Sequence, residues 1–192
     1  MNILILGPQG SGKGTQARRI ADEYGVAHVS TGDMFRAAIA AGTPLGLQVQ
    51  PILESGQLVP DDLTIELIQA RLQEEDALAG FVLDGFPRTL AQAGALDSML
   101  AAIGRELDVV LELLIAEEIC IERMRGRARE EGRADDTPDV IAARLEVYAR
   151  ETVPVVERYR ATGRLVGIRA ERLPDEVFAE IQNTLEQVEE RS

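Results

Sequence analysis

Residues 3–15 read ILILGPQGSGKGT, a short apolar run that leads directly into a glycine-rich turn. A buried strand, such a turn and a helix start form a phosphate-binding loop, because glycines let backbone N–H groups converge on one anion and the helix N-terminus adds partial positive charge. Lys13 is the only lysine in the chain. An ammonium is a compact charge on a slim stem, so it fits inside a tight loop where a forked guanidinium would fit poorly.

The loop departs from the general pattern G-x-x-x-x-G-K-[ST] in an informative way. Gly7, Gly12 and Lys13 match it, but Gly14 follows the lysine and the hydroxyl arrives one residue later, at Thr15. This shifted form resembles the nucleoside monophosphate kinases, and the adenylate kinases above all. The resemblance implies that the phosphates of ATP are held by Gly10, Ser11, Gly12, Lys13, Gly14 and Thr15.

The composition predicts one globular domain and narrows its partners. The chain has 192 residues, 45% of them apolar, and a formal net charge of −13, which argues against a general nucleic-acid-binding surface. Its single cysteine, Cys120, rules out an intrachain disulfide and a cysteine-based zinc site. The N-terminus lacks a basic signal-peptide region, and no apolar run has the length of a membrane-spanning helix. We therefore expect a cytoplasmic protein without zinc, nucleic-acid or membrane partners. We also expect a monomer, although the composition does not determine this.

Short apolar runs alternate with longer helical patterns along the chain. The expected strands are Asn2–Leu6, Ala27–Ser30, Phe81–Leu83, Val109–Ile115 and Leu165–Ile168. Each is mostly apolar on both faces, as parallel strands buried between helices are. The pattern predicts an α/β fold of the P-loop NTPase type, a doubly wound five-stranded parallel sheet with helices on both faces. Pro154 is expected to kink or divide the long helical pattern that surrounds it.

Two stretches interrupt the alternation and are expected to form mobile lobes on a rigid base. Residues 30–59 contain two short helices in place of one crossover, and residues 126–136 are polar and arginine-rich. The resemblance implies a single kinase domain, 1–192, with a core (1–29, 60–125 and 137–192), an NMP-binding lobe (30–59) and a short lid (126–136).

Two motifs resemble the acceptor-nucleotide site of the adenylate kinases, STGDMFR at 30–36 and LDGFPRT at 83–89. Thr31 opens a helix at a strand end, where its hydroxyl can either cap the helix or meet a base. Arg36 and Arg88 can each reach a phosphate. Residues 57–59 would present their backbone to the base, although two of them fit a simple lobe core equally well. The implied AMP-binding set is Thr31, Arg36, Gln57, Leu58, Val59, Gly85, Phe86, Pro87, Arg88, Gln92, Arg133 and Arg144.

Asp84 is the candidate residue for a metal ion. It ends the third expected strand beside the phosphate loop, where a carboxylate can orient the water ligands of the Mg²⁺ that accompanies ATP. The alternative for this carboxylate is a helix-capping role.

Five arginines fall within eleven residues, which is unusual in an acidic chain: Arg123, Arg125, Arg127, Arg129 and Arg133. Arg123 and Arg127 share a helix face, an arrangement that is unfavourable unless an anion joins them. Arg125 and Arg129 lie on another face and are expected to be solvated. The resemblance assigns phosphate contacts to Arg123, Arg127, Arg133 and Arg144, and a contact near the donor adenine to Arg172. The implied catalytic set is Lys13, Arg88, Arg123, Arg133 and Arg144.

Two departures from the family are visible, Gln9 where a proline is usual and Ala170 where a glycine is common. Neither removes a charged catalytic group. The prediction is reversible transfer of the terminal phosphoryl group of MgATP to AMP, giving two ADP, in adenine nucleotide homeostasis.

Two other functions compete with this prediction. A UMP/CMP kinase would share the fold, the loop and the arginines, but that family usually has a residue smaller than Thr31 at its position. A P-loop hydrolase or switch needs a hydroxyl directly after the loop lysine, where this chain has Gly14.

Overall fold

A computed structural model gives the fold and describes residues 1–131 and 137–190. Within these residues, five strands form one parallel sheet in the order β2-β3-β1-β4-β5. The strands are β1 (Asn2–Leu6), β2 (Ala27–Ser30), β3 (Phe81–Asp84), β4 (Val109–Leu114) and β5 (Leu165–Arg169). The predicted α/β fold is confirmed, and each predicted strand end is correct to within one residue.

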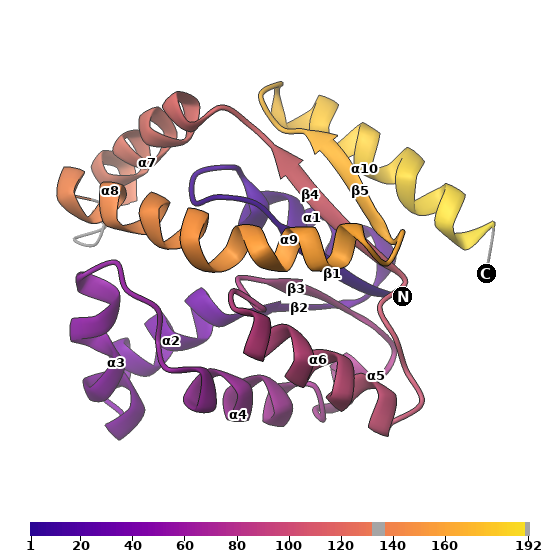
Figure 1. Ribbon diagram of the computed structural model, residues 1–192, viewed down its shortest axis with the longest axis horizontal. Helices are drawn as coiled ribbons and strands as arrows, with labels where there is room; N and C mark the ends of the chain where they lie inside the picture. The colour runs from indigo at the N-terminus through magenta and orange to yellow at the C-terminus, as the bar shows by residue number, and fades with distance from the viewer. Residues whose placement is uncertain (132–136, 191–192) are drawn as a thin grey trace.

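Helices cover both faces of the sheet (Figure 1). In chain order they are α1 (Lys13–Tyr24), α2 (Thr31–Ala40), α3 (Pro44–Glu54), α4 (Asp61–Arg71), α5 (Glu75–Leu78), α6 (Leu90–Ala102), α7 (Glu117–Glu131), α8 (Pro138–Val147), the π-helical turn η1 (Tyr148–Thr152), α9 (Val153–Arg160) and α10 (Pro174–Glu189). Among the described residues, no helix is both long and apolar enough to cross a membrane.

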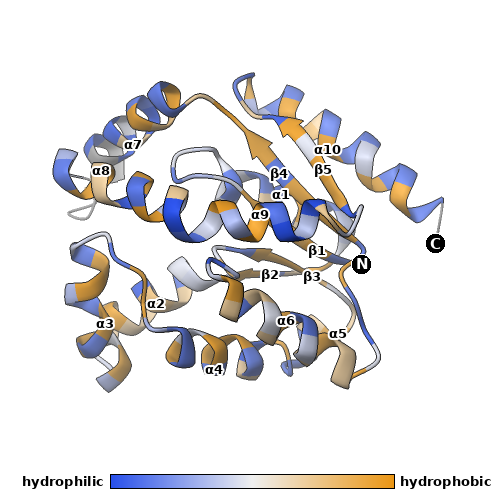
Figure 2. Ribbon diagram, in the orientation of Figure 1, coloured by the Kyte–Doolittle hydropathy of each residue, from blue (hydrophilic) through white to orange (hydrophobic). Residues whose placement is uncertain are grey.

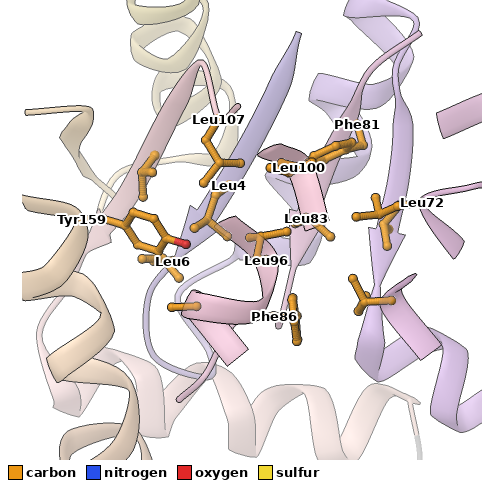
Figure 3. Packing of buried hydrophobic residues seen from close by; sticks show 14 of the residues in the cluster. Leu4, Leu6, Leu72, Phe81, Leu83, Phe86, Leu96, Leu100, Leu107 and Tyr159 are labelled. Atoms are coloured by element: carbon orange, nitrogen blue, oxygen red, sulfur yellow. The ribbon is translucent and has the colours of Figure 1, made fainter. Parts of the chain in front are cut away.

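Alternate residues of the strands supply two separate cores. Leu4 of β1 packs with β3, α4, α6 and α9, whereas Ile3 and Ile5 pack on the other face with α1 and α10. Figure 3 shows the first of these cores, with Leu96 and Leu100 of α6 facing the strands. Figure 2 shows the same design in colour, because the strands are largely hydrophobic while the outer helices alternate. The sheet is therefore fixed by an apolar core on each face, and the residues at the ends of its strands are attached to this rigid support.

Strand β1 lies at the point where the strand order reverses, with β3 on one side and β4 on the other. In such sheets the crevice at the carboxyl ends of the strands is the usual place for a ligand. Ile5 is in register with Asp84, so the end of β3 lies directly beside the turn that follows β1. The topology therefore brings the glycine-rich turn and Asp84 to one edge of the sheet.

Two smaller units extend from this base, each with a core of its own. One is the pair α2–α3, in which Phe35 and Val49 are buried together with Val59 of the segment that follows α3. The other is the pair α7–α8, which buries Cys120, Met124 and Ile141.

One detail of the first small unit corrects the helix-cap alternative for Thr31. Ser30 is the N-cap of α2, and its hydroxyl accepts a hydrogen bond from the backbone N–H of Asp33. Thr31 is instead the first residue of the helix.

Candidate functional site

The turn between β1 and α1 has the backbone geometry of a phosphate cradle. Gly10 and Gly12 adopt positive φ angles of 84° and 93°, which side chains other than glycine's rarely allow. A Cβ on Gly10 would also lie 2.5 Å from the carbonyl oxygen of Cys120, so the turn packs tightly against α7. Gly12 is the N-cap of α1, which directs the first N–H groups of that helix at the space beside the turn.

Lys13 lies inside this turn, as predicted for a compact ammonium. Its Nζ donates hydrogen bonds of 2.7 Å to the carbonyl oxygens of both Gly7 and Pro8. The pKa of Lys13 is lowered to about 8, chiefly by burial, while the carboxylate of Asp84 opposes the shift and nearby arginines add to it. A bound anion would favour the charged ammonium, because an opposite charge at short range stabilises it.

A cavity of about 540 Å³ opens beside the turn and collects positive charge from several elements. Seven basic and two acidic side chains line it, in a protein whose net charge is −13. The basic residues are Lys13, Arg18, Arg36, Arg88, Arg123, Arg127 and Arg144. Like charges gathered in this way repel one another, so the arrangement is suited to a polyanionic ligand.

Arg88 is held at three points in the bend that follows β3. Its backbone N–H donates to Oε1 of Gln92 at 2.7 Å, and its Nε donates to the carbonyl oxygen of Gly85 at 2.8 Å. Its carbonyl oxygen accepts a hydrogen bond of 3.0 Å from the hydroxyl of Thr152. Burial lowers the pKa of Arg88 below its ordinary value, the carboxylate of Asp84 opposes the shift, and two other cavity arginines add to it.

The remaining arginines reach the cavity from helices outside the sheet. Arg36 on α2 donates to Asp33 at 2.5 Å. Burial would raise the pKa of Asp33, but this hydrogen bond and the charges of Arg36 and Arg18 outweigh it, and the pKa is lowered. Arg123 on α7 donates to the carbonyl oxygen of Ala170 at 3.0 Å, which ties α7 to the chain after β5.

Asp84 offers the cavity a carboxylate next to the turn. It lies beside Gly14, whose Cβ, if present, would be 3.3 Å from Oδ2. His28 lies 4.0 Å away, and burial lowers its pKa, so this histidine is neutral at pH 7. No group of three or more His, Cys, Asp or Glu side chains gathers as a metal site within residues 1–131 and 137–190. A single carboxylate still fits Mg²⁺, which usually keeps several waters and binds substrate phosphates.

Comparison with known proteins decides the family. The family model described as "Adenylate kinase" matches residues 5–164. The chain belongs to the adenylate kinase family. It is 48% identical over 181 residues to an adenylate kinase of Stenotrophomonas maltophilia, with 94% of this chain and 97% of that protein covered.

Two further relatives in the adenylate kinase family agree with this assignment. One, from Xanthomonas axonopodis pv. citri, is 46% identical over 185 residues, which cover 96% of this chain and 99% of the relative. The other, from a Cyanothece species, is 49% identical over 186 residues, which cover 97% of this chain and 95% of the relative. The predicted family is therefore confirmed, in preference to a UMP/CMP kinase or a P-loop switch.

Most of the site residues predicted from the resemblance to adenylate kinases line the cavity. From the donor set these are Gly10, Gly12, Lys13, Gly14, Thr15, Arg123 and Arg127. From the acceptor set they are Arg36, Gln57, Gly85, Arg88 and Arg144, and Asp84 lies among them. Residues far apart in sequence thus surround one space, although the contacts that each makes with a nucleotide remain predictions.

Several other predicted acceptor residues lie beside the cavity and not on its wall. The hydroxyl of Thr31 donates to the carbonyl oxygen of Gly85 at 2.9 Å. Gln92 is 2% exposed and its amide spans from Arg88 to Asp61, to which Nε2 donates at 2.8 Å. The other four are Leu58, which is half-buried, and Val59, Phe86 and Pro87, which are buried.

Two predicted donor residues, Ser11 and Arg172, and the predicted acceptor residue Arg133 remain. Ser11 is 2% exposed, and its hydroxyl has no hydrogen-bond partner within the described part of the chain. Arg172 lies outside the cavity lining and pairs with Glu180 of α10. Arg133 falls outside the described residues.

Two charged residues of the cavity wall, Arg18 and Asp33, were not predicted from the sequence. The signal for Arg18 was available, because it lies one helical turn after Gly14 and therefore on the same face of α1. Asp33 stands three residues before Arg36, the spacing of a helical ion pair.

Proposed function

We propose that this chain transfers the terminal phosphoryl group of MgATP to AMP, reversibly, through the cavity beside the glycine-rich turn. Adenylate kinase activity, in which ATP and AMP give two ADP, follows from membership of the family. The observation that supports these residues as the machinery is the convergence of Lys13 and the arginines on one space. Phosphoryl transfer requires little covalent chemistry from the protein, so positioning and neutralisation of charge carry the catalysis.

The donor phosphates would bind over the turn and the start of α1. Gly10 and residues 12–15, Lys13 among them, line this space, and Arg123 and Arg127 border it from α7. Mg²⁺ would be held by the phosphates and by waters oriented by Asp84, with Thr15 as a further oxygen donor. The ion would screen the charge on the phosphate oxygens as the phosphoryl group moves.

The acceptor phosphate would lie between Arg36, Arg88 and Arg144, which border the cavity from α2, from the bend after β3 and from α8. Arg88 is the best placed to touch the transferring group, because its Nε is already fixed by Gly85. Guanidinium groups suit this task, since each can donate two parallel hydrogen bonds to phosphate oxygens.

We assign the division into core, NMP-binding lobe (30–59) and short lid (126–136) as part of the same proposal. Its support is that α2–α3 and α7–α8 have cores separate from those of the sheet. Closure of these units over the cavity would exclude water and prevent loss of the phosphoryl group to hydrolysis. We further propose a monomer in the cytoplasm.

The test is Lys13→Met in the full chain, assayed for ADP formation with MgATP and AMP. We expect turnover to fall at least about 10³-fold, because a buried charge that faces the reacting phosphates is lost. A variant with near-normal turnover would contradict the proposal. ATP consumption without AMP should be slow in the wild type, since rapid acceptor-independent hydrolysis is the property of a switch.

A matched pair of arginines on α7 provides the control. Arg127 lines the cavity, whereas Arg125 lines a separate outer groove between α7 and α8. Arg127→Ala should reduce turnover strongly and Arg125→Ala should leave it near the wild-type value. Equal losses in the two variants would show that the effect comes from the helix and not from the cavity.

A further inference from the structure

Helices α8 and α9 follow one another in one long helical segment (Figure 1). The hydrogen-bond pattern of this segment changes in the middle. Residues Tyr148–Thr152 form a π-helical turn, in which the N–H of Val153 bonds to the carbonyl of Tyr148, five residues earlier. The cause is Pro154, which lies two residues after Thr152, the last residue of the turn. Pro154 has no N–H, and its ring would collide with the carbonyl four residues before it in a regular α-helix. Such wide turns inside helices occur frequently at functional sites.

The wide turn changes which side chains share a face of the segment. Arg144 and Thr152 are eight residues apart, and at about 100° per residue a regular α-helix would place them about 80° from each other. A π-helical turn absorbs one residue, so the angle between them falls to about 20°. Both side chains therefore face the same region. Arg144 lines the main cavity, and Thr152 lines a small adjoining cavity, in each case together with Arg88.

Thr152 meets Arg88 directly. Its side chain is 5% exposed, and its Oγ1 donates to the carbonyl oxygen of Arg88 at 3.0 Å. On the other side of the same residue, Gln92 accepts from the N–H. Thr152 and Arg88 are 64 residues apart in the sequence, so this bond joins two separate parts of the fold. The bonds to the peptide groups on both sides, together with the bond from Nε to Gly85, set the direction of the guanidinium.

We propose that Thr152 is a positioning residue for phosphoryl transfer, acting through Arg88. The proposal rests on the role of Arg88 given under Proposed function. Without the hydroxyl, the carbonyl of Arg88 loses a buried partner, and the bend can rotate to find another. Because the same helical segment carries Arg144, the π-helical turn also sets the spacing between two arginines that face one acceptor phosphate.

The experiment is a double-mutant cycle on the full chain with Thr152→Val and Arg88→Ala. Valine keeps the shape of threonine and removes the hydroxyl, and Thr152→Ser restores a donor. We expect Thr152→Val to lower kcat by about 10- to 100-fold, as misplacement of a catalytic group does, with a smaller change in KM for AMP. Thr152→Ser should recover most of kcat. In the Arg88→Ala background, Thr152→Val should cause little further loss, because the two residues act in series.

Each other outcome has a distinct meaning. Normal kcat for Thr152→Val, beside a collapsed Arg88→Ala, would overturn the inference and leave the proposed function intact. The same holds if Thr152→Val only lowers the melting temperature, or if its loss of kcat is equally large without Arg88. Normal turnover of Arg88→Ala would instead refute the role of Arg88 and, with it, this inference.

Discussion

The phosphate loop and the cavity arginines approach the same space from two differently built regions. The loop extends from β1, where Ile3, Leu4 and Ile5 are 0% exposed and are covered by helices on both sides. Arg36, in contrast, belongs to the small α2–α3 unit, and Arg144 belongs to the α7–α8 unit, whose buried cores contain few residues. The lysine is thus attached to a fully buried strand of the sheet, and most of the cavity arginines belong to the two smaller units.

The largest expected effect is a loss of stability, and it should differ between the core of the sheet and the small core of the α2–α3 unit. Leu4→Ala should lower the free energy of unfolding by about 2–5 kcal/mol, because the strand cannot move to fill the space left in the sheet core. Val49→Ala in the α2–α3 unit should cost only about 1–2 kcal/mol and should weaken AMP binding more than it lowers global stability. Urea denaturation and AMP titration measure the two quantities. Equal losses of stability would show that the unit is part of one cooperative core.

The next largest effect is a pH dependence of the free energy of unfolding, which follows from the lowered pKa of the buried Lys13. The pKa is about 8 in the folded protein against 10.5 for an ordinary lysine, so the unfolded chain binds more protons between these pH values. The free energy of unfolding should therefore rise with pH over this window, and the rise should total about 3 kcal/mol. Lys13→Met should lack this contribution, since no other lysine is present. Parallel stability curves for wild type and variant from pH 7 to 10.5 would contradict the prediction.

The smallest expected effect comes from breaking the ion pair between Asp33 and Arg36. Asp33→Asn removes the ion pair with Arg36, whose two side chains are 43% and 40% exposed. Because exposed pairs contribute about 0–1 kcal/mol, stability should change within that range. AMP affinity should rise slightly as the guanidinium is released, and the gain should shrink in high salt. Calorimetric titration at two salt concentrations checks this, and weaker AMP binding would show that the pair positions Arg36.

The sequence predicted those parts of the molecule that depend on local pattern. Strand ends and the phosphate loop follow from apolar runs and glycines that lie close together in the chain. The contacts that hold Arg88 were beyond such reasoning, because Thr152 is 64 residues away from it and Asp61 is 31 residues away from Gln92. The ion pair between Arg172 and Glu180 could not be predicted from local pattern either, because an arginine on a turn can pair with any of several nearby acidic residues.

The π-helical turn after Arg144 gives a second physical reason why part of the site could not be predicted from the sequence. Pro154 predicted a kink or a division of the helical pattern, but not that the interruption would take the form of a wide turn. A kink would change the direction of the segment, whereas a π-helical turn changes which residues face inward. Regular α-helical spacing from Arg144 would therefore place Thr152 on a different face from the one that it occupies.

The contrast between the acidic protein and its basic cavity has a consequence for how nucleotides arrive. At a distance, an anionic nucleotide is repelled by the net charge of −13, and it is attracted only near the cavity with its seven basic and two acidic side chains. Salt at physiological concentration limits both fields to about 8 Å, so the repulsion matters most in dilute buffer. Association should thus accelerate as salt is first added and slow only when the local attraction is screened as well. The exterior of the protein discourages adsorption of large polyanions, while small ones that fit the cavity are admitted.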